Sequence, residues 1–372
     1  MSEQAYVGFD EKPREAPQPI RVSWLGNPWS LAGLCLLNVL LIVITVGIYW
    51  FWARSEYRRH MWQMVRIEDE PLEYSGTGRE LLSGYIRLFL FVIVPAIVIA
   101  FGSQLIFGPR HPAVIFVTFV LYFSLLFLYF AGVFRAHRYI LSRTRWRGIA
   151  FGVGPGAGGY AWTSLWTGFL SALTIGWLWP WRTVALRRRL TSAMYFGSIP
   201  FRFDPGFGAS LYTPFAFLWL SFLTFYIPVI SMQAQLNEAL RQSGDGTRAV
   251  VIHPSPAQSA LMLAGVLLVV AALSWYEARK LNLFAEATGI EGVYGTLKAS
   301  GGSIFWLTFS NVLILVLSLG ILRPVAQARR LRYLVERFSF AGSTDLSKVL
   351  REQRTSGIEG AGLEAAFSIE IF

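Results

Sequence analysis

The chain has 372 residues, of which 54% are hydrophobic and only 15% are charged, and its mean hydropathy is +0.47. Soluble domains carry a charge on about a quarter of their residues, so this composition argues against a soluble protein. The net charge is +11, but the basic residues cluster directly after apolar runs. Because membrane proteins hold basic residues on the cytoplasmic side of their spans, this placement needs no nucleic-acid partner, and we expect none.

The first 22 residues are polar, contain proline and have mixed charge, which predicts a disordered N-terminal tail. They match neither a signal peptide nor a targeting sequence. We therefore expect the first apolar run to act as an uncleaved insertion signal.

Seven apolar runs follow the tail, and none contains Asp, Glu, Lys or Arg. Each is close to the length of about 20 residues that crosses a bilayer core. Trp and Tyr crowd the ends of the runs, as expected at the level of the lipid headgroups. The sequence predicts an all-α membrane protein with about seven apolar segments: Trp29–Trp52, Leu88–Phe107, Ala113–Phe134, Ala161–Trp181, Pro214–Met232, Ala257–Tyr276 and Ser303–Leu322.

Three of these runs share a motif centred on a glycine: Gly47, Gly176 and Gly320. A hydroxyl residue stands two positions before each glycine, a polar residue stands nine before it and an arginine stands twelve after it. Agreement at several offsets indicates an internal repeat. The aligned residues are Thr45, Thr174 and Ser318; Asn38, Thr167 and Asn311; and Arg59, Arg188 and Arg332.

A second pattern follows five of the runs, in which a basic helical turn precedes short alternating segments around Gly, Ser or Pro. Such alternation around turn residues is typical of β-hairpins, so we predict short hairpin appendages after the basic ends of the runs. Their strands are expected near residues 65–74, 144–151, 195–203, 287–294 and 337–340.

Together the two patterns divide the chain into units. We predict repeat unit A over 23–160, repeat unit B over 161–302, a half unit over 303–342 and a C-terminal tail over 343–372. A short helix is expected in that tail, from Thr344 to Arg354, because Ser343 or Thr344 can cap it.

The orientation of the five hairpins is left open by the sequence. Seven simple spans would place the third and fourth hairpins on the opposite side from the other three, with Arg182 and Arg187 to Arg189 outside. Alternatively, the three motif-bearing runs are re-entrant or broken at the glycine, which is tolerated where protein or water covers the backbone. Inverted repeats would instead favour a transporter plan.

One segment, from Trp24 to Leu82, resembles the YjgN-like family of bacterial inner-membrane proteins. The residues that carry the resemblance are Thr45-Val46-Gly47-Ile48-Tyr49, Trp52-Ala53-Arg54, Arg58-Arg59 and the run from Glu73 to Leu82. Weaker copies at 174–203 and 318–340 extend it, although Arg323 departs from the pattern by replacing an aromatic residue. The resemblance implies a multi-pass protein of the bacterial inner membrane and supplies no activity.

Polar residues inside the apolar runs are candidates for a functional site, because such residues face the protein interior or a cavity. Asn38 and Asn311 could line a solute site near the midplane. Alternatively, they could form hydrogen bonds between helices, and we favour this structural interpretation. The set comprises Asn38, Thr45, Thr167, Thr174, Asn311 and Ser318, together with the repeat glycines Gly47, Gly176 and Gly320.

Basic residues just beyond the aromatic belt are the best candidates for contact with anionic headgroups or with a partner. Their plainer role is to set the topology. The candidates are Arg54, Arg58, Arg59, Arg135, Arg138, Arg187, Arg188, Arg329, Arg330 and Arg332.

Catalytic and metal-binding patterns are missing from the sequence, since the four histidines have no ligand spacing and the Gly-rich stretch Gly152–Gly159 lacks the lysine of a phosphate loop. We expect no enzyme activity, cofactor or metal. The leading hypothesis is a polytopic protein that binds lipids or a partner as a scaffold, and the alternative is a passive transporter or channel built from repeats. A protein partner or a homo-oligomer is compatible with both.

Overall fold

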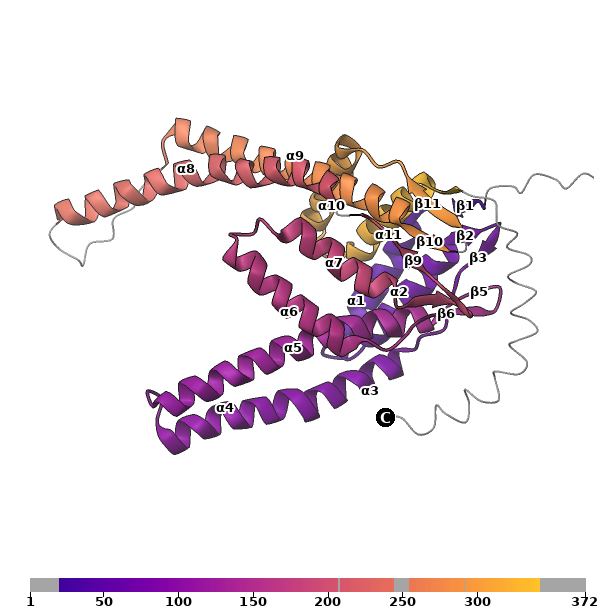
Figure 1. Cartoon of the computed structure of the whole chain (residues 1–372), viewed down its shortest axis with the longest axis horizontal. Coiled ribbons are helices and arrows are strands. Elements are labelled where there is room, and N and C mark those ends of the chain that lie inside the picture. The colour runs from indigo at the N-terminus through magenta and orange to yellow at the C-terminus, as the bar shows by residue number, and fades with distance from the viewer. Residues whose placement is uncertain (1–19, 207, 244–253, 291, 342–372) are drawn as a thin grey trace, which may run out of the picture.

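The structure is a computed structural model that describes residues 20–206, 208–243, 254–290 and 292–341 (Figure 1). Most of the N-terminal tail predicted for residues 1–22, the C-terminal tail from 343 and the helix predicted for 344–354 lie outside the described residues. The described chain is mostly helical, with small antiparallel sheets gathered at one end of the molecule (Figure 1).

Two long helical hairpins project from the sheets in the same direction (Figure 1). In the first, α3 (Gly78–Leu88), the π-helical segment η2 (Phe89–Ile93) and α4 (Val94–Phe107) run on into each other, and α5 (Pro112–Ser142) returns. The second pairs α8 (Tyr212–Ser243), which follows the short η3 (Ala209–Leu211), with α9 (Pro256–Ala287). Within the described ranges, four helical stretches are long and apolar enough to cross a membrane: Gly78–Phe107, Pro112–Ser142, Ala209–Gln242 and Pro256–Ala287.

The other three apolar runs do not form single helices, so the predicted count of seven segments is not confirmed. Each run is divided at its glycine motif into two short helices that form a hairpin. The first pairs α1 (Leu31–Ile44), which follows η1 (Pro28–Ser30), with α2 (Trp50–Met64). The second pairs α6 (Ala157–Leu173) with α7 (Trp179–Thr191), and the third pairs α10 (Gly301–Leu317) with α11 (Arg323–Arg337).

The three turns that divide the runs have the same backbone geometry. Gly47, Gly176 and Gly320 have φ values of +90°, +84° and +82°, a region that glycine enters without steric cost. Each glycine N–H donates to the carbonyl five residues earlier, at 2.8, 2.6 and 2.8 Å. This bond ends the first helix in the manner of a glycine C-cap, and the chain reverses.

A hydroxyl group holds both sides of each turn together. Thr45 Oγ1 donates to the Leu41 carbonyl at 2.7 Å and accepts from the Tyr49 N–H at 3.0 Å. Thr174 repeats both bonds, and the Ser318 hydroxyl accepts from the Leu322 N–H at 3.2 Å. The hydroxyl therefore accepts a hydrogen bond from a backbone N–H at the start of the second helix, where no carbonyl of that helix is available.

Most of the predicted hairpins form, and their strands also pair with strands from other parts of the chain, which gives three antiparallel sheets. The first sheet joins β1 (Val22–Trp24), β2 (Val65–Ile67) and β3 (Glu70–Pro71). The second has the order β4 (Glu73–Tyr74), β5 (Thr144–Trp146), β6 (Ile149–Val153), β7 (Met194–Phe196) and β8 (Ile199–Pro200). The third has the order β12 (Phe338–Ala341), β11 (Val293–Leu297), β10 (Thr288–Ile290) and β9 (Arg202–Phe203).

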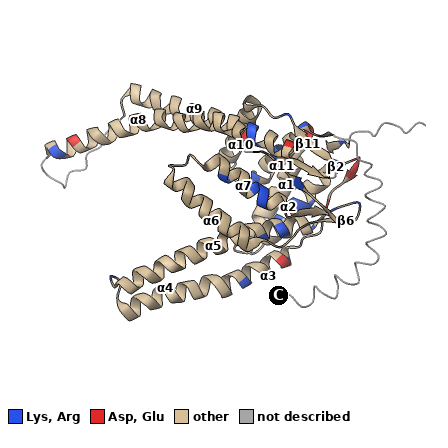
Figure 2. Ribbon diagram, viewed as in Figure 1, with Lys and Arg blue, Asp and Glu red and all other residues tan. Residues whose placement is uncertain are grey.

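The charged residues follow this division between sheets and helices. Lys and Arg gather around α2 and α7, close to the sheets, whereas most of the length of α4, α5 and α9 carries no charge (Figure 2). A single β-hairpin would be marginal in water. The second and third sheets join strands that follow different helical hairpins, so these two sheets tie the bases of all five helical hairpins together.

Candidate anion site between two helical hairpins

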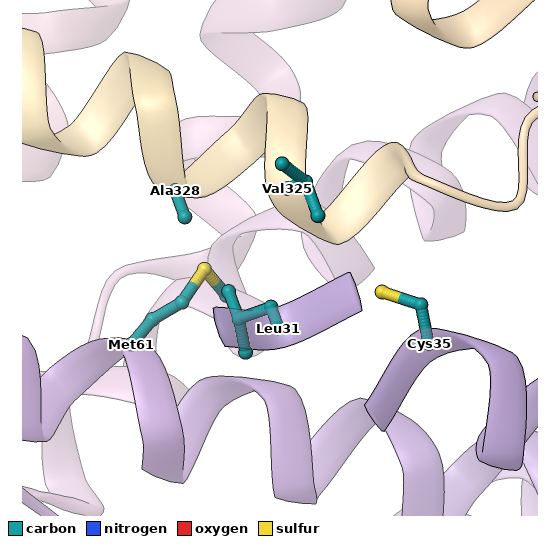
Figure 3. Close-up of a cluster of buried hydrophobic side chains, with 5 residues drawn as sticks. All are labelled: Leu31, Cys35, Met61, Val325 and Ala328. Atoms are coloured by element: carbon teal, nitrogen blue, oxygen red, sulfur yellow. The ribbon is translucent and has the colours of Figure 1, made fainter. Parts of the chain in front are cut away.

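Two of the short hairpins, whose turn glycines Gly47 and Gly320 are 273 residues apart in sequence, pack directly against each other. Leu31 and Cys35 on α1 and Met61 on α2 meet Val325 and Ala328 on α11, and all five side chains are buried (Figure 3). The small Cys35 and Ala328 side chains leave room for the two hairpins to approach closely. Their contact fixes the turn of the third hairpin beside the first.

A cavity of about 400 Å³ lies between these hairpins, next to the buried cluster. A volume of this size falls within the range of small-molecule sites. Its apolar wall comes from both hairpins and includes the turn of the third. The side chains of this wall are Val39, Ile42, Trp50, Leu319, Ile321 and Pro324.

Two arginines, Arg54 on α2 and Arg323 at the start of α11, face this cavity, and no carboxylate lines it. Among the described residues neither arginine has an ion pair. The Arg54 guanidinium lies 4.9 Å from the centre of the Trp50 ring, a cation–π distance. Partial burial, together with the charges of Arg58 and Arg323, lowers the pKa of Arg54. Two cations without a counter-ion favour an anion between them.

A second cavity, of about 540 Å³, lies on the other side of α11 and differs in its charges. It also contacts Arg323, but Glu277 on α9 lies in its lining. Glu277 forms an ion pair with Lys280 and lies 3.8 Å from the guanidinium of Arg330. One carboxylate therefore offsets part of the basic charge of the second cavity, whereas no carboxylate lines the first.

The ten arginines predicted to contact headgroups have different environments. Arg54 alone of the ten lines the first cavity, and it is exposed, as are Arg59, Arg135 and Arg138. Six are engaged by the protein itself. Arg58 donates to the Tyr74 hydroxyl, Arg187 lies over the Phe284 ring, Arg188 donates to the Gly206 carbonyl, Arg329 donates to Asn311, Arg330 faces Glu277 and Arg332 pairs with Glu336.

Arg187 is half-buried. Burial lowers its pKa, and its Nε has no hydrogen-bond partner among the described residues. Arg187 lines neither of the two cavities described above.

The two asparagines at matching repeat positions also differ. The Asn311 oxygen accepts from Arg329 Nη1 at 2.9 Å, and its nitrogen donates to the Ala326 carbonyl at 3.3 Å. Asn38 is fully buried near Tyr57, yet neither of its amide atoms reaches hydrogen-bond geometry with a described residue. Thr167, the third member, donates to the Thr163 carbonyl within α6. The predicted set therefore does not converge on one site.

Comparison with known proteins places the chain in a family. Residues 19–366 match DUF898, described as "Bacterial protein of unknown function". The chain belongs to this family. The match covers both hairpins of the arginine cavity and nearly all of the described structure. It is consistent with the resemblance to YjgN-like proteins seen in the sequence.

Two curated relatives of this DUF898 chain are named inner membrane protein YjgN. The protein from Salmonella typhimurium is 30% identical over 120 residues, which is 32% of this chain and 27% of that protein. The protein from Escherichia coli O157:H7 is 24% identical over 143 residues, covering 38% and 33%. The matched segments therefore span a third or less of these relatives. No solved structure matches the chain.

The family match and the four apolar helices identify a membrane protein of unknown function. Sequence reasoning missed Arg323 as a site residue, although it marked this position as the one where the third motif departs from the others. The signal was an arginine at the position where the first two copies of the motif have Trp50 and Trp179. Arg323 and Arg54 line the same cavity because two hairpins that are distant in sequence pack together. No local sequence pattern indicates that packing.

Proposed function

We propose that this DUF898 protein is a multi-pass protein of the bacterial inner membrane that binds an anionic lipid in the arginine cavity. The two long hairpins cross the membrane, and the three short hairpins enter it and turn back. The sheets support this topology, because pairing of β4 with β5 and of β9 with β10 ties the bases of the hairpins together on one side. That side also carries the gathered arginines, so it is the cytoplasmic side.

The chemistry of the cavity supports an amphiphilic ligand. Arg54 and Arg323 supply donors for a phosphate or carboxylate, and arginine forks bind such groups through paired hydrogen bonds. Val39, Ile42 and Leu319 supply a surface for a hydrocarbon chain. The observation that carries this proposal is the pair of arginines without counter-ions in an apolar cavity.

A binding experiment with matched variants tests the assignment. Purified, delipidated protein is titrated with phosphatidylglycerol or phosphatidylcholine and the bound lipids are counted by native mass spectrometry. We expect Arg54→Gln with Arg323→Gln to weaken phosphatidylglycerol binding about tenfold or more, since each lost charged hydrogen bond is worth about 1.5–3 kcal/mol. Phosphatidylcholine binding should be weak in both proteins.

The control removes the same charge elsewhere. Arg135 and Arg138 are exposed and lie on α5, away from the cavity, so replacing both by Gln should leave phosphatidylglycerol binding unchanged. Equal loss in both double variants would mean that net charge alone attracts the lipid. Competition by inorganic phosphate as strong as that by phosphatidylglycerol would identify a soluble anion as the ligand and contradict the lipid assignment.

The alternative, a passive transporter or channel, receives less support. Its central residues were Asn38 and Asn311, and both hydrogen-bonding ends of Asn311 are engaged by α11. The buried, unpartnered amide of Asn38 is the observation that still favours it. Loss of a solute flux in Asn38→Leu proteoliposomes, with lipid binding intact, would establish this second function.

A further inference from the structure

The residues at the outermost points of the three short hairpins are apolar and almost fully exposed. Val46, Ile175 and Leu319 stand directly before the turn glycines, with 91%, 77% and 91% of their surface accessible. Isolated exposed apolar residues are ordinary on a protein surface. Three at the same position of three equivalent turns point to a common use.

The backbone conformation at these three positions disfavours the apolar residues that occupy them. Val46, Ile175 and Leu319 have φ values of +52°, +52° and +49°, in the left-handed region that side chains other than those of Gly, Asn and Asp rarely enter. For a β-branched residue this conformation is a true outlier. The other non-glycine residues with positive φ in the described chain are Glu68, Asp69 and Arg147, which are polar and lie in β-turns. The helical turns therefore keep apolar side chains despite the strain.

The distance from each turn to the next charge sets how deep the turn can enter a hydrocarbon layer. Arg54 follows Gly47 by seven residues, Arg182 follows Gly176 by six and Arg323 follows Gly320 by three. At the rise of an α-helix these segments measure about 10, 9 and 5 Å. A full crossing needs about 30 Å, whereas interfacial elements enter by about 5–10 Å.

Tryptophans lie along these short segments, as expected for a position at the membrane surface. Trp50, Trp177, Trp179 and Trp181 are each at least 40% exposed. Tryptophan is enriched where headgroups meet hydrocarbon. In the first two hairpins, the chain that follows the apolar tip passes first through tryptophan and then reaches arginine. This order matches the hydrocarbon, the interface and the charged headgroups of one leaflet.

Building on the membrane topology proposed above, we infer that the three tips insert into the acyl region of a single leaflet, the one nearest the sheets, with the first two deeper than the third. The occupant facing Val46, Ile175 and Leu319 is lipid. The α6–α7 hairpin points in the same direction as the two long apolar hairpins, which reach farther (Figure 1). A bilayer that surrounds the long hairpins therefore also surrounds the tip of this short one.

Depth measurements test this inference without reference to lipid specificity. In a Cys35→Ala background, single cysteines replace Val46, Ile175 or Leu319, and each is labelled with a fluorophore in proteoliposomes. Phosphatidylcholine carrying a nitroxide at carbon 5 or carbon 12 serves as the quencher, and iodide serves as the aqueous quencher. A label at exposed Ser142, beside the sheets, and one at Leu105, at the far end of α4, are the controls.

We expect at least threefold stronger quenching by the carbon-5 lipid than by iodide at all three tips, with Leu319 the shallowest. Ser142 should respond to iodide alone. Iodide quenching of the tips equal to that at Ser142 would overturn the inference. So would protection from both quenchers combined with disulfide formation between copies at the tips, because the tips would then face a second chain. In the Arg54→Gln, Arg323→Gln variant, the label at Ile175 should give the same quenching, because its nearest charge, Arg182, is unchanged. Failure of lipid binding and failure of insertion are therefore separable.

Discussion

The long and short helical hairpins begin as similar stretches of sequence and end as different structures. The run within α5 and the run from Trp29 to Trp52 are both free of charge and long enough to cross a bilayer. One is part of a 31-residue helix, whereas the other reverses at Gly47. α8 even contains Pro228 and continues through it. All three runs that turn carry a hydroxyl residue two positions before a glycine, whereas Pro228 does not end α8.

The largest effect on stability is expected from a substitution at a turn glycine. Nothing lies within 4 Å of a Cβ added at Gly176, so the cost of Gly176→Val comes only from its φ of +84°. We expect a loss of about 2–3 kcal/mol in the free energy of unfolding in detergent. Gly132→Ala in α5 is the control, because Gly132 lies in a helix, also has open space around it and should gain about 0.5–1 kcal/mol. A loss at both positions would remove the distinction between the two kinds of hairpin.

A smaller effect is expected from the paired asparagines of the short hairpins. Asn311→Leu leaves the Arg329 guanidinium without one of its acceptors, which should cost about 1–3 kcal/mol. Asn38→Leu removes an amide that has no hydrogen-bond partner among the described residues, so it should cost less than half as much. Thermal unfolding of the two variants in the same detergent measures the difference. Equal losses would mean that Asn38 has a partner, such as buried water, in the folded protein.

The smallest effect concerns the hydroxyl that joins the two sides of a turn. Thr45→Val keeps the shape of the side chain but leaves the Tyr49 N–H without its acceptor, and we expect a loss of about 1 kcal/mol. Thr163 donates only to a carbonyl of its own helix, so Thr163→Val should change stability by a few tenths of that. Indistinguishable unfolding midpoints for the two variants would contradict the role given to Thr45.

Much of the local structure could be predicted from the sequence. The strand segments were expected from their alternation, and β2 and β5 have the predicted residues, 65–67 and 144–146. The four long helices were expected from their apolar length. The division of the other three runs could not be decided, because composition does not distinguish a helix that crosses from one that turns. Left-handed backbone at Val46 contradicts the preference of valine and is stabilised by the turn as a whole.

The candidate site was predicted only in part, for a different physical reason. Arg54 was selected because it follows an aromatic belt, which is a local property. Arg323 belongs to the site through the packing of Leu31 and Cys35 on Val325, a contact between segments at opposite ends of the chain. The pairing of β9 with β10 is similarly non-local. Contacts of this kind depend on complementary surfaces rather than on periodicity.

Labelling of cysteines in intact cells tests most directly whether all the sheets lie on the same side of the membrane. In a Cys35→Ala background, single cysteines replace the exposed Ser75, Ser142, Ser192 and Ser300, each near the base of a hairpin, and Arg110 in the turn between α4 and α5. An impermeant maleimide should label only the cysteine at position 110, with the other four protected until the cells are opened. Labelling at 192 and 300 with protection at 75 and 142 would mean that the short hairpins cross the membrane, which would contradict the account.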